Sequence, residues 1–220
     1  MKKSKVNFKL NNMGRIKLFF CFLLVFISSD LISQDNKVPV EPSETWLNNQ
    51  HQPEKLMDAI GLKEGITIAD IGAGRGRMTV WFADRVGEKG KVYANDIDEG
   101  ALEYLEQRCR KNNIRNVELI YGKVDNPMLP EGIVDIAFMI SVYHHLEKPV
   151  DMMKNTIPGL KKNGILVIVE RDPLKTRQTG SESTSREKLT RHANEAGFVL
   201  DRVNTELLER DNIYFLKVKK

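Results

Sequence analysis

Three closely spaced glycines carry the strongest chemical signal in this chain. They lie in the run Asp70-Ile71-Gly72-Ala73-Gly74-Arg75-Gly76, where an apolar segment, residues 66–71, gives way to a helical pattern. Glycines at such a junction let the backbone turn tightly and approach a ligand, whose polar groups then meet free amides at the helix start. The run therefore predicts a ligand-binding loop.

An acidic residue, Asp96, ends the next expected strand, residues 92–96. A carboxylate at that place can accept hydrogen bonds from both hydroxyls of a ribose. A dinucleotide fingerprint would have its third glycine at position 77, but Arg77 stands there, so the spacing favours S-adenosylmethionine over NAD. The alternative role for Asp96 is a helix cap, but Asp98 is better placed to cap the helix expected at residues 99–111.

Together these residues resemble motif I and the acidic loop of the class I S-adenosylmethionine-dependent methyltransferases, and the resemblance covers Pro53 to the C-terminus. It implies that Asp70 lies near the methionine amino group of the cofactor and that Asp96 holds its ribose. Residues at the ends of the third and fourth strands complete the expected site. The expected cofactor-binding residues are Asp70, Gly72, Gly74, Gly76, Asp96, Ile97, Val124, Asp125 and Ser141.

The chain departs from this family after its third strand. Many relatives have Gly-Asp-Ala there, with the aspartate reaching the adenine amine, whereas this chain has Gly122-Lys123-Val124-Asp125. Lys123 cannot accept a hydrogen bond. Either backbone groups of Val124 or the side chain of Asp125 are therefore expected to contact adenine.

The fourth expected strand ends in Ile140-Ser141-Val142-Tyr143-His144-His145-Leu146, similar to the family segment beneath the transferred methyl group. His144 or His145 can deprotonate an incoming nucleophile, because imidazole titrates near neutrality. The alternative is that both histidines only shape the turn into the next helix. Tyr143 and Trp46 are candidate contacts for the methyl acceptor.

Acidic and basic residues also follow the fifth strand, at Glu170, Arg171 and Asp172, where a solvated loop is the expected structure. Two adjacent histidines without a spaced third ligand are poor evidence for a metal, so no metal site is expected.

Strands and helices alternate after residue 53, which predicts a Rossmann-like α/β fold with a mostly parallel sheet and helices on both faces. The last two strands are joined by a short connection around residues 209–212, which allows only an antiparallel pair. We expect seven strands, at residues 66–71, 92–96, 117–121, 135–140, 165–170, 199–203 and 213–218. The helices expected are residues 53–60, 78–85, 99–111, 150–157 and 185–196, the last with a capping box formed by Thr184 and Glu187.

The N-terminal part of the chain has a different character. Residues 1–33 carry six basic side chains against Asp30 alone, and they contain the apolar run Leu18 to Ile27. This layout predicts a signal peptide or membrane-targeting segment, cleaved near Ser33, and the apolar run is short for a membrane span. A buried N-terminal helix is the alternative. Residues 34–52 are expected to form a polar linker or arm, and residues 53–220 the methyltransferase domain.

The net charge of +4 belongs to this targeting segment, since the remaining residues carry a net charge of about −1. A near-neutral domain has no electrostatic footprint for a phosphate backbone, so a nucleic-acid partner is not expected. We expect a small-molecule acceptor, membrane contact only through the N-terminal segment, and export to a periplasmic or membrane-associated site in a bacterium. The protein is cytoplasmic if that segment is not functional. The alternative function is an exported, non-catalytic module that binds or senses S-adenosylmethionine.

Overall fold

The computed structural model describes residues 38–176 and 183–220. The expected targeting segment, residues 1–33, lies outside the described residues. None of the helices in the described part of the chain is long and apolar enough to cross a membrane.

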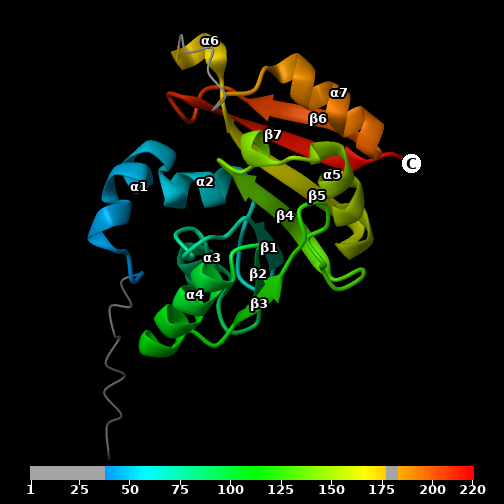
Figure 1. The fold of residues 1–220 in the computed structure, drawn as a ribbon. Helices are drawn as coiled ribbons and strands as arrows, with labels where there is room; N and C mark the ends of the chain where they lie inside the picture. The colour runs from blue at the N-terminus through cyan, green and yellow to red at the C-terminus, as the bar shows by residue number, and fades with distance from the viewer. Residues whose placement is uncertain (1–37, 177–182) are drawn as a thin grey trace, which may run out of the picture. The chain divides into compact units, whose positions relative to one another are not determined.

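Within the described residues, seven strands form one sheet in the order β3-β2-β1-β4-β5-β7-β6 (Figure 1). The first five strands pair in parallel, and β7 runs antiparallel to both of its neighbours. The strands are β1 (Thr67–Ile71), β2 (Lys91–Asp96), β3 (Val117–Tyr121), β4 (Val134–Ile140), β5 (Leu160–Arg171), β6 (Phe198–Asn204) and β7 (Asp211–Val218). This arrangement confirms the Rossmann-like α/β fold expected from the sequence.

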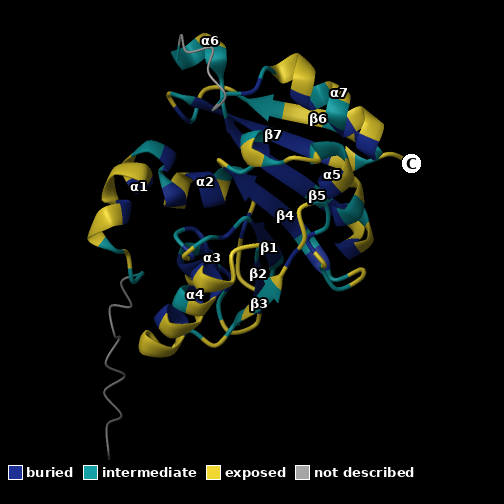
Figure 2. Cartoon of the chain, viewed as in Figure 1, coloured by how far each residue is buried: buried dark blue, intermediate teal, exposed yellow. Residues whose placement is uncertain are grey.

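Helices cover both faces of the sheet, and each face has its own apolar core. Helices α2 (Pro53–Ala59) and α3 (Thr79–Val86) pack on one face through Leu56, Met57 and Phe82. Helix α4 (Glu99–Lys111) packs beside β2 through Leu105. Helices α5 (Pro149–Thr156) and α7 (Arg186–Ala196) contribute the second core. Figure 2 shows the result, with buried central strands between helices whose outer surfaces are exposed.

Most elements begin and end within one or two residues of the sequence-based bounds, but two differ. Strand β5 begins at Leu160, five residues before the expected start, because it continues beyond the apolar segment on which the expectation was based. The short helix α6 (Pro173–Thr176) was not expected.

The cap expected on the last helix was assigned one residue too early. Ser185, not Thr184, is the N-cap of α7, and its hydroxyl accepts a hydrogen bond from the Lys188 amide at 3.2 Å. Thr184 is buried instead, with 2% of its surface exposed. Two neighbouring hydroxyl residues give the same sequence signal, and only the backbone conformation decides which of them caps the helix.

The described part of the segment expected to be a polar arm, residues 38–52, is largely helical. A 3-10 turn, η1 (Pro42–Glu44), leads into α1 (Thr45–His51). The turn is fastened to α4 by a two-pronged ion pair, in which Arg108 donates to both oxygens of the Glu44 carboxylate at 2.7 and 2.8 Å. Arg108 also donates to the carbonyl oxygens of Arg75 and Pro39. The buried guanidinium of Arg108 thus joins the segment around Pro39 and Glu44 to the glycine-rich loop.

Replacement of Glu44 by alanine tests this attachment. Glu44 and Arg108 are only 8% and 5% exposed, and removal of one partner from a buried pair leaves an uncompensated charge. We expect Glu44→Ala to lower the free energy of unfolding by about 3 kcal/mol, measured by urea denaturation. Glu106→Ala removes an exposed pair with Arg110 and should cost about 0.5 kcal/mol or less. Equal losses in the two variants would contradict the assignment.

Candidate active site

The glycine-rich loop follows β1 at the carboxyl edge of the parallel strands, where α/β sheets bind their ligands. Gly72, Gly74 and Gly76 all have positive φ, at 76°, 54° and 83°. The amides of Gly72 and Ala73 both donate to the carbonyl oxygen of Asn95 in β2, at 2.8 and 2.9 Å. The loop is therefore held against the second strand in a backbone conformation that residues with a Cβ rarely adopt.

Each of the three glycines meets different surroundings. A Cβ on Gly72 would lie 2.4 Å from a methyl group of Val142, and one on Gly76 would lie 2.2 Å from a methyl group of Leu105. A Cβ on Gly74 would have no heavy atom within 4 Å. Gly72 and Gly76 thus allow close packing inside the protein, whereas Gly74 borders open space that a ligand can occupy.

Asp96 faces this loop from the end of β2. Its carboxylate accepts from the amides of Gly74, at 2.7 Å, and Asp98, at 2.9 Å. A carboxylate has about four lone-pair sites, so it can still accept hydrogen bonds from a ligand. Asp98 caps α4 by accepting from the Ala101 amide at 3.1 Å, as the sequence predicts.

Exposed apolar side chains stand at the ends of β2 and β3. Ile97 is 51% exposed and Val124 is 42% exposed, which is unusual for aliphatic residues next to a buried sheet. Asp125 is bound from two sides, since Lys148 lies 3.3 Å from its carboxylate and Asn155 donates to its carbonyl oxygen. The two aliphatic residues can therefore supply an apolar surface for a flat ring, such as adenine.

Asp70 is a buried acid at the end of β1. It is 2% exposed and accepts a 2.7 Å hydrogen bond from the Thr79 hydroxyl. Burial raises the pKa of Asp70 to about 6, while the Thr79 hydrogen bond and the charge of Arg77 act in the opposite direction. A cation placed beside this carboxyl would favour its ionised form.

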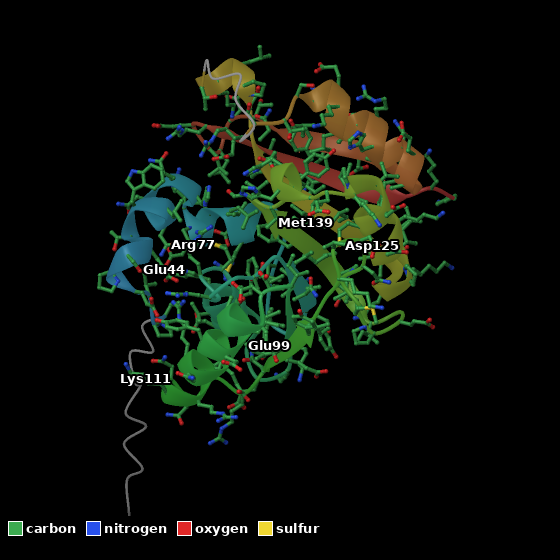
Figure 3. The ribbon with its side chains drawn as sticks, in the orientation of Figure 1. Glu44, Arg77, Glu99, Lys111, Asp125 and Met139 are labelled. Carbon is green, nitrogen blue, oxygen red and sulfur yellow. The ribbon has the colours of Figure 1, made fainter. Side chains whose placement is uncertain are left out.

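Arg77 connects the loop to the N-terminal helices. Its guanidinium donates to the Asn48 side chain at 3.1 Å and lies 3.0 Å from Nδ1 of His51 (Figure 3 labels Arg77 beside α1 and α2). Burial, with the charges of Arg77 and Arg171, lowers the pKa of His51 to about 3, so its Nδ1 is free to accept. Nε2 of His51 lies 3.6 Å from the Asp211 carboxylate at the start of β7.

The two candidate catalytic histidines have different surroundings. Nδ1 of His144 lies 2.7 Å from the Glu170 carboxylate, which is fully buried at the end of β5. His145 is exposed, and its ring centroid lies 4.0 Å from that of His144. The solvated loop expected around Glu170 is thus wrong for this residue, because its carboxylate is covered and hydrogen-bonded.

Ser141 and the two candidate acceptor contacts are spread more widely. Ser141 follows β4 with φ of 55°, a strained backbone for a residue with a side chain. Tyr143 is 2% exposed, and its hydroxyl lies 2.7 Å from Nδ1 of His192 in α7, so the structure directs it into the core. Trp46 lies on α1 and is 56% exposed.

Sequence reasoning did not identify three charged or titratable residues of this edge. Arg77 was noted only as a departure from the dinucleotide pattern, and His51 was not singled out at all. Glu170 was assigned to solvent. The available signals were weak: Arg77 adjoins the last glycine of the loop, and Glu170 ends an otherwise apolar strand.

Comparison with known proteins agrees with this geometry. Residues 62–209 match the model of a family described as a methyltransferase domain. The chain belongs to the methyltransferase domain family. This membership confirms the class I S-adenosylmethionine-dependent methyltransferase resemblance on which the cofactor site was expected.

Several relatives carry specific names. A crystal structure of a SAM-dependent methyltransferase from Aquifex aeolicus is 28% identical with a TM-score of 0.72, covering 81% of this chain and 94% of that one. A probable cobalt-precorrin-6B C(15)-methyltransferase (decarboxylating) from Sulfolobus acidocaldarius is 30% identical over 142 residues, which are 60% of this chain and 71% of the relative. A demethylmenaquinone methyltransferase from Geobacillus is 25% identical over 117 residues, 53% of this chain. This chain spans about half the length of that relative.

Replacement of Asp96 by alanine tests the ribose site. Two hydrogen bonds to a charged carboxylate, each worth about 1.5 to 3 kcal/mol, make affinity for S-adenosylhomocysteine fall about 100-fold or more. The sequence alone predicts nearly unchanged folding, but the bonds to the Gly74 and Asp98 amides correct this expectation. We expect a loss of about 1 to 2 kcal/mol in urea denaturation.

Asp98→Ala is the matched control for Asp96→Ala. It removes the α4 cap and should cost about 1 kcal/mol while calorimetry shows affinity close to normal. If Asp98→Ala abolished binding and Asp96→Ala did not, the ribose assignment would be wrong.

The raised pKa of Asp70 predicts a specific pH dependence. An acid with a pKa raised by folding destabilises the native state as pH rises, so the free energy of unfolding should fall between about pH 4 and pH 7. Asp70→Asn should lessen that fall in the free energy of unfolding.

The same carboxyl predicts a pH dependence of binding. A cationic methionine group favours the ionised carboxyl, so affinity for the cofactor should rise over the same pH range in the native protein and not in Asp70→Asn. Calorimetry and urea denaturation across pH check both, and an identical pH dependence in the variant would refute the role.

Proposed function

We propose that this chain transfers the methyl group of S-adenosylmethionine to a small-molecule acceptor. The observation that carries the proposal is the open space in front of Gly74, bordered by the Asp96 carboxylate and by a loop whose other glycines are closed by packing. The family match and the names of the relatives support the same reaction. The exported, non-catalytic alternative gains no support from these relatives.

The residues present fit this cofactor. Asp96 would accept from the ribose hydroxyls, and Asp70 would face the methionine amino group. The backbone of Gly72, Gly74 and Gly76 would line the part of the cofactor between these two groups. Ile97 and Val124 would hold adenine, with Asp125 at the rim and Ser141 toward the methyl end. The bound cofactor supplies a sulfonium methyl that is ready for displacement. The protein supplies orientation and removes water from the reacting atoms.

The acceptor is proposed to enter from the side of β4 and β5, where His144 and Glu170 lie. Trp46 on α1 offers an exposed aromatic surface for it, whereas Tyr143 acts through packing. The names of the relatives refer to a quinone precursor and a corrin precursor, both of them small organic molecules. A small-molecule acceptor is therefore the proposed class, and its identity is left to experiment.

Calorimetry with purified protein tests the proposal at its first step. S-adenosylmethionine and S-adenosylhomocysteine should both bind, and NAD should not, because Arg77 stands where a dinucleotide site needs a third glycine. A screen with methyl-labelled cofactor and a panel of quinols, phenols, amines and thiols then identifies the acceptor class. Binding of NAD with no response to either methionine compound would refute the proposal.

A further inference from the structure

Glu170 is an acidic residue whose side chain is buried at the end of β5. Its side chain is fully buried, although glutamate is among the residues least often buried without a partner. Its carboxylate lies within hydrogen-bond distance of the His144 Nδ1, at 2.7 Å, the His144 amide, at 3.2 Å, and the Arg171 amide, at 3.1 Å. Three donors thus compensate a charge that is costly to remove from water.

This contact decides which nitrogen of His144 carries the proton. An ionised carboxylate only accepts hydrogen bonds, so Nδ1 of neutral His144 must be the donor. Nε2 then holds the lone pair, and the hydrogen bonds of His144 within the described part of the chain involve only its amide and Nδ1. The His144 side chain is 9% exposed, so the ring is held firmly but is not sealed from solvent. That is the tautomer a base needs.

His145 lacks these features, although it is adjacent in sequence. It is exposed, and within residues 38–176 and 183–220 no carboxylate lies within ion-pair distance of its ring. The fold therefore distinguishes two residues that the sequence leaves equivalent.

The turn that carries His144 packs against the glycine-rich loop. Ser141 begins it with φ of 55°, and Val142 packs against Gly72, where a Cβ would come within 2.4 Å. His144 is two residues beyond that contact, at the carboxyl edge of β4, and Glu170 is at the carboxyl edge of neighbouring β5. The pair of His144 and Glu170, called the dyad below, thus lies at the same edge of the sheet as the glycine-rich loop.

We propose that His144 is the general base of the reaction and that Glu170 is its positioning residue; this inference rests on the proposed methyl transfer. Nε2 of His144 takes the proton from the nucleophilic atom of the acceptor as that atom forms a bond to the methyl carbon. The bond between methyl carbon and sulfur breaks, and its electron pair stays on sulfur, leaving neutral S-adenosylhomocysteine. The charge of the imidazolium is balanced by Glu170.

The proposal specifies the class of acceptor. A base is useful only when the nucleophilic atom carries a proton that it must lose, as a hydroxyl oxygen does. A thioether or a tertiary amine has no such proton and gains nothing from the dyad. We therefore assign this site to an acceptor whose nucleophilic atom is the oxygen of a weakly acidic hydroxyl.

Nitrogen NMR of the imidazole rings tests the dyad without an acceptor. In the complex with S-adenosylhomocysteine, neutral His144 should show the proton on Nδ1, and Glu170→Gln should weaken this preference because an amide side chain can donate as well as accept. The tautomers of His145 should be unchanged in that variant. A proton on Nε2 of neutral His144, or a tautomer preference that ignores Glu170→Gln, overturns the proposal. Failure to bind S-adenosylhomocysteine would instead contradict the proposed function.

Turnover with the acceptor found in the screen gives the second test. His144→Ala should lower kcat about 100-fold and Glu170→Gln about 10-fold, with cofactor affinity changed less than about 3-fold. His145→Ala, the control, should keep the native kcat; equal losses in both histidine variants contradict the assignment.

Discussion

The backbone conformation of the glycine-rich loop is the constraint on which the rest of the site depends. Gly72 and Gly76 have positive φ and leave no room for a Cβ, because Val142 and Leu105 fill the space. The loop is thus fixed between the turn after β4 and the helix α4. Gly74 lies between these two fixed points and borders open space. Packing at Gly72 and Gly76 therefore holds in place the one glycine of the loop that a ligand can approach.

Compensated charges hold the N-terminal helices against this loop. Arg108 binds Glu44 and the carbonyl oxygen of Arg75, and Arg77 binds Asn48 and His51. These groups are largely buried, so each loses its hydrogen bonds to water and forms hydrogen bonds to other protein groups instead. The segment before the sheet therefore belongs to the same folded unit as the loop, which accounts for buried polar residues in a stretch that has the composition of a linker.

Much of the fold and the cofactor loop could be predicted from the sequence. Apolar segments alternating with helical periods predicted the parallel part of the sheet, and the short connection before β7 required an antiparallel pair. The cap formed by Asp98 and the left-handed turns at the glycines followed from local rules, since both depend on neighbouring residues. Thr184 and Ser185 show the limit of such rules, because both satisfy the same pattern.

Residues whose partners are distant in sequence could not be assigned in this way. Glu44 finds Arg108 on α4, His51 finds Arg77 and Asp211, and His144 finds Glu170 on another strand. No local pattern distinguishes a buried glutamate at a strand end from a solvated one. The choice between the adjacent histidines needed the pairing of β4 with β5, which brings only one of them to a carboxylate.

A crystal structure of the protein with S-adenosylhomocysteine measures the central claim directly. The account predicts that the ligand lies against Gly74, that its ribose hydroxyls bind Asp96, and that its sulfur faces the turn carrying His144, with the loop backbone unchanged. A ligand bound elsewhere, or a loop that must rearrange before Gly74 can approach it, would contradict the account.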